Sequence, residues 1–481
     1  MLRRPFTAAA LAALLAACTL GPAYERPAAE LPARWIESPP EGVKAPGSRW
    51  WTMYGDSALD RLVEEAFATN QDLVLATARV DEARALSQIA DSRRMPAVDA
   101  SFERDRVRLS ERSPIPLPPS AIENNSYRAQ LNVAYEVDLW GRLRSASNAA
   151  RAELLASEAN RETVRIALTT EVVRAYFALV AFDAQVEATR RSLALRGEGL
   201  ALQKVRRDAG LINEFALRQL EAEVAAARAQ LPALEANRTA QELALAVLLG
   251  RSPRAIMEGA VERRTGQGEP AAPVVPEGLP SDLLLRRPDV VSAEQLLIAN
   301  NARIAEARAA LFPRIGLSGY LGSESTALSD LFSGPAAIWS LGFALAQPIF
   351  QGGRLLAEVD AVKARERQAV AQYQKTLQEA FREVRQALNT QVKAREVFEA
   401  ESVRTVALEE ALRLAVIRYR NGLLSQLEVL DSERNLLQAE LNRSDALRVQ
   451  RAAVADLVRA LGGGWQGLDA APVADAGNVR R

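Results

Sequence analysis

Residues 354–421 read RLLAEVDAVKARERQAVAQYQKTLQEAFREVRQALNTQVKAREVFEAESVRTVALEEALRLAVIRYRN, a stretch without glycine or proline. Apolar side chains recur in it at steps of three and four residues, with charged residues between them, as in Tyr373, Leu377, Ala380 and Val384. This spacing predicts one long helix with a packed seam. At about 1.5 Å per residue the helix would be roughly 100 Å long. A helix of that length fits either a coiled-coil strut or one stave of a helical barrel.

The composition of the chain narrows its function class. Its 481 residues are 48% hydrophobic and carry 60 basic and 60 acidic side chains, which disfavours both a disordered chain and a polycationic nucleic-acid surface. There is no histidine, the commonest general base and transition-metal ligand. No phosphate-binding loop or nucleophile motif is found either. We therefore expect no enzyme, no metal site, no cofactor and no nucleic-acid partner.

Residues 1–17 predict a secretory signal peptide, because two arginines precede an apolar, alanine-rich run that is too short to span a bilayer as a helix. The run ends at Cys18, the single cysteine of the chain. The segment Leu15-Ala16-Ala17-Cys18 resembles a bacterial lipobox, so we expect a covalent lipid on Cys18. Thr19, in place of an aspartate, resembles the sorting signal for the outer membrane. An incidental cysteine at the end of a signal peptide is the alternative.

The first half of the mature chain alternates between helical and strand periods. Residues 18–48 are rich in proline and predict a lipidated, extended N-terminal tether. Two helical segments follow, and then the pattern predicts strands at about 97–104 and 127–139 and a long helix at about 142–208. The second strand has Tyr127 at one end and Trp140 just after the other, as in the aromatic girdles of transmembrane barrel strands. An ordinary half-buried hairpin would explain the alternation alone.

The second half repeats the first. We expect repeat 1 over residues 49–250, an inter-repeat linker or equatorial region over 251–280, repeat 2 over 281–465 and a C-terminal tail over 466–481. Repeat 2 has predicted strands at about 314–321 and 339–350 and a long helix at about 354–421. Landmarks recur at an offset of 212 residues, as in Gly141 and Gly353, Val172 and Val384, and Gly210 and Gly422. The chain is therefore predicted to be a tandem repeat of helix, β-hairpin, long helix, turn and helix.

Four transmembrane strands in one chain cannot close a barrel. Bacterial barrels have at least eight strands, and an open edge leaves backbone groups unpaired in hydrocarbon. Two chains would supply eight strands and three would supply twelve, and the strand pattern does not choose between them. Both long helices leave the same end of their hairpins, so they would continue the barrel into one compartment as staves. Because one strand face is polar, the pattern predicts an outer-membrane conduit with a watery lumen and a periplasmic tunnel.

Five stretches carry a family resemblance: GPAYERP at 21–27, LPSDLLLRRPD at 279–289, PIFQGGR at 348–354, RYRNG at 418–422 and LGGGW at 461–465. Together they resemble the TolC-like outer-membrane factors, specifically the OprM/NodT-type efflux lipoproteins. The resemblance implies a mainly α fold with a transmembrane β-barrel part. It implies a homotrimer whose twelve-stranded β-barrel is continued by a twelve-helix periplasmic α-barrel.

The resemblance also implies location and partners. The protein would be anchored by lipid in the cell outer membrane and extend into the periplasm. There it would dock to a periplasmic adaptor, or membrane fusion, protein that couples it to an inner-membrane RND pump.

A closable periplasmic aperture follows from the same resemblance. The family's aperture positions match Tyr419, Glu428, Asp431 and Arg434, and its adaptor-contacting tips match Gly210, Leu211, Gly422 and Leu423. Three copies of each acid around a narrow pore would attract cations and favour closure by links to arginine or tyrosine. Solvated charges on a helix surface are the alternative interpretation.

Two positions depart from the family's pattern at the aperture. Leu424 stands where some members have a basic residue, and Ala216 stands where some members have an acid. The link that fastens the closed state in those relatives is therefore not carried over, and the nearby Glu214 is only a candidate substitute.

These features predict a passive exit duct of a tripartite, RND-type efflux system for drugs and other small molecules, with a role in antibiotic resistance. The nearest alternative is the outer-membrane duct of a type I protein secretion system. A soluble coiled-coil scaffold is a third hypothesis, which the four amphipathic strands and the lipobox disfavour.

Overall fold

The computed structural model describes residues 20–28, 47–112, 118, 122–264, 272–273, 285–465 and 467–468. The predicted signal peptide, Cys18, much of the tether and the tail beyond residue 468 lie outside the described residues. The chain divides into two compact units. Unit 1 comprises Met1–Ala29, Arg79–Ser157 and Ser292–Gln374, and unit 2 comprises Glu30–Ala78, Glu158–Val291 and Lys375–Arg481.

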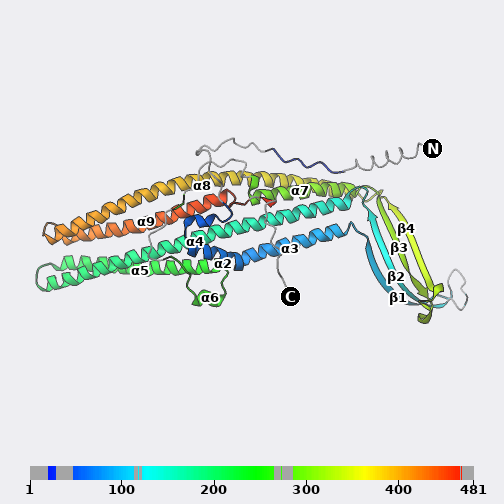
Figure 1. The fold of residues 1–481 in the computed structure, drawn as a ribbon, viewed down its shortest axis with the longest axis horizontal. Coiled ribbons are helices and arrows are strands. Elements are labelled where there is room, and N and C mark those ends of the chain that lie inside the picture. Colours follow the sequence, from blue (N-terminus) through cyan, green and yellow to red (C-terminus); the bar gives the residue numbers. More distant parts are fainter. Residues whose placement is uncertain are drawn as a thin grey trace. The chain divides into compact units, whose positions relative to one another are not determined.

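Unit 1 is built around a four-stranded antiparallel sheet in the order β1-β2-β3-β4 (Figure 1). The strands are β1 (Ala97–Arg108), β2 (Glu123–Val137), β3 (Arg314–Ser325) and β4 (Ala337–Ala346). The central pairing of β2 with β3 joins the two repeats. Leu131 of β2 lies opposite Leu321 of β3, which lies opposite Trp339 of β4. Since side chains in register share a face, an apolar row crosses the sheet.

The two faces of this sheet differ in polarity. Neighbouring apolar rows place Leu341 and Phe343 of β4 beside Trp339, and these three side chains are 81%, 67% and 76% exposed. On the opposite face, Asn132 donates a hydrogen bond to Ser101 (3.1 Å) and accepts one from Gln130 (2.9 Å). The sheet thus presents an exposed apolar face and a hydrogen-bonded polar face.

The strand ends differ from those that the alternation predicts. β1 continues to Arg108 instead of ending at 104, and β2 begins at Glu123 instead of 127, because Glu123 binds arginines of β1 at 3.1 and 3.4 Å. β3 continues to Ser325 instead of ending at 321, because Glu324 in this extension binds Arg128 of β2 at 2.9 Å. Charged pairs between strands extend the ladders beyond the apolar alternation.

The strands also end earlier than predicted on the side where the helices begin. β4 ends at Ala346 instead of 350, since Pro348 has no N–H to donate. β2 ends at Val137 instead of 139, because Asp138 already accepts hydrogen bonds from the backbone N–H groups of Leu143 and Arg144. A capping side chain and a proline therefore set these two boundaries.

Two long helices follow the two hairpins. α4 (Arg142–Asp208) and α8 (Arg354–Arg420) have 67 residues each, about 100 Å at the rise of an α-helix. α8 ends one residue before the predicted 421. α5 (Glu214–Leu248) and α9 (Gln426–Ala460) have 35 residues each and complete two helical hairpins (Figure 1). Each bound of α8 and α9 is 212 higher than the matching bound of α4 and α5, as a tandem duplication requires.

Shorter helices precede the two β-hairpins, β1-β2 and β3-β4. They are α2 (Ser57–Thr69), α3 (Gln71–Ser92) and α7 (Pro288–Ala309), with the 3-10 turn η1 (Trp50–Tyr54) before α2. α3 and α7 have 22 residues each and occupy matching places in the two repeats. Within the described residues, no helix combines the length and the apolar character that crossing a bilayer requires.

The core of unit 2 takes side chains from both repeats. Val172 of α4 and Val384 of α8, one of the pairs at an offset of 212, are both fully buried in a cluster with Trp51. The buried hydroxyl of Tyr176 donates to Asp56 (2.6 Å), whose other oxygen accepts the N–H groups at the start of α2. The tyrosine hydroxyl thus holds the aspartate that caps the start of α2.

Arg287 lies in one of the sequence stretches that carry the family resemblance and contacts three helices. It is buried and donates to the carbonyl oxygen of Ala460 (2.8 Å) at the end of α9. It also donates to Asp289 (2.6 Å) and to Glu383 of α8 (2.9 Å). One guanidinium therefore joins the start of α7 to both helices of the second hairpin.

The inter-repeat linker contains a short helix that the sequence analysis missed, α6 (Pro253–Glu258). Ser252 caps it, and Pro253 occupies its first position, two start signals that lie in a segment otherwise rich in glycine and proline. These six residues of the linker are therefore helical, which the sequence analysis did not predict.

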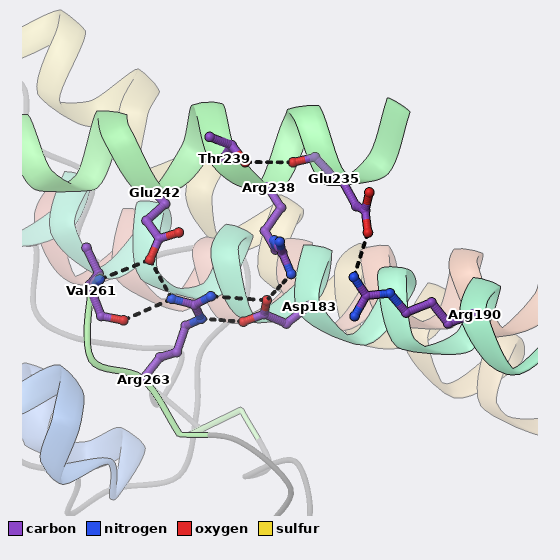
Figure 2. A network of polar contacts seen from close by, with 8 residues as sticks. All are labelled: Asp183, Arg190, Glu235, Arg238, Thr239, Glu242, Val261 and Arg263. Atoms are coloured by element: carbon purple, nitrogen blue, oxygen red, sulfur yellow. Dashed lines mark hydrogen bonds and ion pairs between the residues drawn. The ribbon is translucent and has the colours of Figure 1, made fainter. Parts of the chain in front are cut away.

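After α6 the chain is fastened to the first helical hairpin by Arg263 (Figure 2). Arg263 donates to Asp183 of α4, to Glu242 of α5 (2.7 Å) and to the carbonyl oxygen of Val261 (2.9 Å). Burial acts to lower the pKa of Arg263, but its hydrogen bonds to the two carboxylates outweigh that effect and hold the pKa above its ordinary value. The segment behind α6 is thus tied to α4 and α5 by one cation.

Replacing Arg263 by alanine should destabilise unit 2, because it leaves Asp183 and Glu242 partly buried without this cation. We expect a loss of about 2 kcal/mol in the free energy of unfolding. Thermal unfolding of the detergent-solubilised protein, followed by circular dichroism, measures it as a lower midpoint. Arg254→Ala is the matched control, since Arg254 is 84% exposed and pairs only with Glu258 within α6 among the described contacts. Equal midpoints for the two variants would contradict the assignment.

Candidate functional site

The two helical hairpins end in turns of the same construction. Gly210 and Gly422 have φ angles of +69° and +73°, the left-handed conformation that a residue with a Cβ adopts at a cost. The next residues, Leu211 and Leu423, return their N–H groups to carbonyl oxygens inside the preceding helices, both at 2.8 to 2.9 Å. Their side chains are 70% and 73% exposed. Each predicted tip therefore presents one apolar side chain on a rigid, glycine-terminated turn.

Phe215 is an exposed aromatic residue near the first tip that the sequence analysis did not single out. It lies in the first turn of α5 and is 70% exposed. Its place directly after the turn was visible in the sequence, but its exposure was not.

Tyr419 is engaged by the first hairpin. Its hydroxyl accepts hydrogen bonds from Gln203 (2.7 Å) and Arg206 (2.5 Å), both on α4. The Arg206 guanidinium also lies 5.9 Å from the centre of the tyrosine ring. Gln203 is buried and donates as well to Gln426 at the start of α9 (3.2 Å). A single polar cluster thus joins α4, α8 and α9 beside the tips.

Gln203 and Gln426 were missed from the sequence. The contact of Arg206 with Tyr419 was not predicted either. Their partners lie more than 200 residues away along the chain, and no local pattern marks such a contact.

Glu428 caps the start of α9. Its carboxylate accepts hydrogen bonds from the N–H (2.9 Å) and hydroxyl (2.8 Å) of Ser425, and the serine hydroxyl accepts from the N–H of Glu428. The backbone hydrogen bond, followed by that of the hydroxyl, lowers the pKa of Glu428 below its ordinary value. Ser425-x-x-Glu428 is a capping box, a local signal that could have been read from the sequence.

Asp431 and Arg434 form an ion pair one helical turn apart on α9, and Asn435 also donates to Asp431 (3.3 Å). Both charged side chains are more than half exposed. Together with Glu428 they line a groove between α8 and α9. Three of the four predicted aperture residues are thus neighbours in the groove, whereas the hydroxyl of Tyr419 is bound by α4.

The candidate substitute Glu214 is engaged within its own hairpin. Its carboxylate binds Arg207 (3.3 Å) and Arg218 (2.7 Å). Ala216 lies in the first turn of α5, and its N–H is capped by the side chain of Asn213 (2.9 Å). The charge of Glu214 therefore stabilises the first tip locally.

A buried arginine on α4 faces two further helices. Arg196 is 4% exposed, and its guanidinium lies 3.6 Å from Glu223 of α5 and 4.0 Å from Glu433 of α9. Burial raises the pKa of Glu433, and the charge of Arg196 opposes that rise. This group couples the two hairpins through a second polar contact, which the sequence did not indicate.

In the described part of the chain, His, Cys, Asp and Glu side chains form no group of three or more that could hold a metal ion. The charged residues near the tips are instead engaged in ion pairs and helix caps. This geometry suits side chains that hold helices together and present charge to water.

The sequence profile of the family described as "Outer membrane efflux protein" matches residues 62–251 and 279–463. The chain belongs to the outer membrane efflux protein family. Outer membrane protein OprJ of Pseudomonas aeruginosa is 35% identical over 460 residues, which cover 95% of each chain. The solvent efflux pump outer membrane protein SrpC of Pseudomonas putida is 36% identical over 461 residues, covering 94% of this chain and 96% of that one.

The solved structures agree with this family. The CmeC outer membrane channel of Campylobacter jejuni superposes with a TM-score of 0.86 at 26% identity, over 93% of this chain and 96% of that one. The predicted fold class, an α-barrel with a β-barrel part, is therefore confirmed. The predictions of an outer-membrane location and of an outer-membrane efflux channel are confirmed too, and a type I secretion duct is not favoured. The proteins it resembles are channels rather than enzymes.

Because the chain belongs to the outer membrane efflux protein family, we expect the exposed apolar face of the sheet to contact lipid. Leu341→Arg should therefore reduce insertion, since an arginine on the lipid face costs up to about 2–4 kcal/mol near the bilayer midplane. Ser340→Arg is the matched control, because Ser340 is the preceding residue and points to the polar face. The measurement is the protease-resistant fraction in the outer membrane. If both variants insert equally well, the faces are assigned wrongly.

Proposed function

We propose that three copies of this chain form the passive exit duct of a tripartite, RND-type efflux system. The observation that carries the proposal is the sheet of unit 1, in which β1 and β4 each pair on one side. Four strands cannot close in lipid, whereas eight strands from two copies or twelve from three can, and the resemblance to trimeric outer-membrane factors supports three. The helices of the three copies would continue the barrel as a twelve-helix tunnel. Energy would come from an inner-membrane RND pump, to which a periplasmic adaptor protein would connect the duct.

Drugs and other small molecules are the proposed cargo. SrpC is named for solvent efflux, which supports small apolar molecules as one class. The polar face of the sheet supports a water-filled lumen, through which compounds would pass without a dedicated binding pocket.

A strain that lacks this chain should become susceptible to several chemically unrelated compounds, because they share one exit. Minimum inhibitory concentrations of a compound panel, with and without a plasmid copy, measure the effect. Leu341→Arg on the plasmid is the control for insertion, and it should fail to complement. Unchanged susceptibility together with the loss of a secreted protein would favour the type I alternative.

The aperture would be closed by the cluster around Tyr419. Leu424 and Ala216 stand where some family members have a basic and an acidic residue, so the link between those charges is not carried over. Gln203 and Arg206 of α4 bind the Tyr419 hydroxyl instead. Moving the second hairpin outward would break these contacts, at about 1–3 kcal/mol for a hydrogen bond to a charged group. Glu428, Asp431 and Arg434 would supply the charges of the pore, and the tips at Leu211 and Leu423 would meet the adaptor.

Arg206→Ala should favour the open aperture, because it removes the charged donor to Tyr419. We expect a higher single-channel conductance in planar bilayers, with Tyr419→Phe acting in the same direction. Asp431→Ala should also raise conductance, because it removes a carboxylate whose links to arginine would favour closure. Arg207→Ala is the matched control, since Arg207 binds Asp208 and Glu214 instead. A conductance that rises as much in the control as in Arg206→Ala would exclude this closure.

Lipid anchoring at Cys18 completes the proposal. The lipobox supports it, and two or more acyl chains suffice for stable membrane attachment. Its test is combined with that of the segment that follows Cys18, described next.

A further inference from the structure

The N-terminal strap, residues 20–28, lies along α7 in the opposite direction. Arg308 donates to the carbonyl oxygen of Leu20 (3.2 Å), Asn301 to that of Pro22 (3.1 Å), and Glu294 binds side chains further along the strap. The three helix residues are seven apart, two helical turns, so they share one face of α7. The strap therefore follows a straight path over that face.

The strap and the helix match in length. Fourteen helical residues, from Glu294 to Arg308, rise about 21 Å. The six steps from Leu20 to Arg26 span about 20 Å when extended. The strap is thus close to its full extension and has little slack between its two ends.

Gly21 lets the strap lie directly on the helix. A Cβ at this position would be 2.5 Å from the Cβ of Ala305, closer than two such atoms approach. Because Gly21 and Ala305 are both small, the backbone of the strap lies against α7. This contact places Gly21 near the end of α7 that precedes β3.

Glu294 is the chemical centre of the contact. Its side chain is 9% exposed, and its carboxylate accepts hydrogen bonds from Arg26 at 2.6 and 2.8 Å and from the Tyr24 hydroxyl at 3.0 Å. The bond to Glu294 raises the pKa of Arg26, and burial, followed by the charge of Glu294, raises that of Tyr24. A two-point arginine–carboxylate pair is both strong and directional.

A buried tyrosine adds to the polar character of this site. Tyr373 of α8 is 1% exposed, and its hydroxyl has no hydrogen-bond partner among the described residues. Burial, followed by the charge of Glu294, raises its pKa. Removing Arg26 would leave the buried Glu294 carboxylate without its cation, which is strongly unfavourable.

We propose that Glu294 is the docking residue of the strap, and that docking holds the N-terminal end of the mature chain at the β3 end of α7. The role in anchoring rests on the proposed lipidation of Cys18. Cys18 lies two residues before Leu20, a span of at most about 7 Å. Trp140 marks this end of the helix: it donates to the carbonyl oxygen of Pro313 (2.9 Å) and packs on Phe312. Tryptophan is enriched where strands enter the headgroup region, so acyl chains and strands would enter the membrane at one level.

The test is a cross-link between Pro22→Cys and Asn301→Cys, which leaves Gly21 and Ala305 unchanged. The two positions are close, because the Asn301 side chain lies 3.1 Å from the Pro22 carbonyl oxygen. A short bismaleimide joins the two cysteines in whole cells, and the product is read as a mobility shift on a denaturing gel. We expect it to form in the otherwise unchanged chain. Its yield should fall several-fold in Arg26→Ala and in Glu294→Gln, although both changes lie away from the cross-link. Arg26→Lys should give an intermediate yield, because lysine cannot make the two-point contact.

The controls separate docking from misfolding. Arg354→Ala removes an exposed pair with Glu358 in the same unit and should leave the yield unchanged. Arg26 is 52% exposed, and Tyr24→Phe deletes a single hydroxyl, so these changes test the strap even if Glu294→Gln does not fold. Equal yields in the parent and in Arg26→Ala, or no cross-link in the parent, would overturn the proposal.

Acylation is measured separately by incorporation of labelled palmitate. Cys18→Ala should abolish the label, and a label that persists would overturn lipidation at Cys18. A labelled chain whose cross-link ignores Arg26 and Glu294 would overturn docking and leave the anchor standing. An unlabelled chain whose cross-link depends on both residues would overturn the lipid anchor and leave docking standing.

Discussion

Among the described residues, β1 and β4 are each paired on one side only, and these open edges are the constraint on which the rest of the molecule depends. In water such edges can bind solvent, but in hydrocarbon each free N–H and C=O is costly. The exposed apolar face of the same sheet requires that environment. Assembly is therefore a condition of insertion, and the helices that continue from the hairpins are brought together by the same event.

The two hairpins of helices are joined by polar contacts at several places. Arg196 of α4 faces Glu433 of α9, and Tyr419 of α8 binds α4 near the tips. Between these polar contacts lie apolar ones, as in the cluster that contains Val172 and Val384. Hydrophobic burial supplies most of the stability of such an interface, whereas the polar contacts select one alignment of the hairpins.

Much of the fold could be predicted from the sequence, because its largest elements have strong local signals. The long helices lack glycine and proline over most of their length and keep one apolar period, and the strands alternate apolar and polar residues. The ends of β1 and β3 could not be predicted, since the pairs of Glu123 and Glu324 with arginines carry no apolar alternation. α6 was hidden because its cap lies in a segment rich in glycine and proline.

The candidate site was predictable only in part. The glycines of both tips follow from the helix-ending pattern. The contacts of Tyr419 with Arg206, and of Glu294 with Arg26, join residues more than 200 positions apart and leave no periodic trace. The pairing of β2 with β3 has a further consequence, because it joins one repeat to the next within a chain just as the proposed pairing of β4 with β1 would join neighbouring copies. A chain of half this length, with a single hairpin, would reach the same closed barrel as a ring of six subunits, so the duplication replaces half of the encounters between subunits by covalent connection.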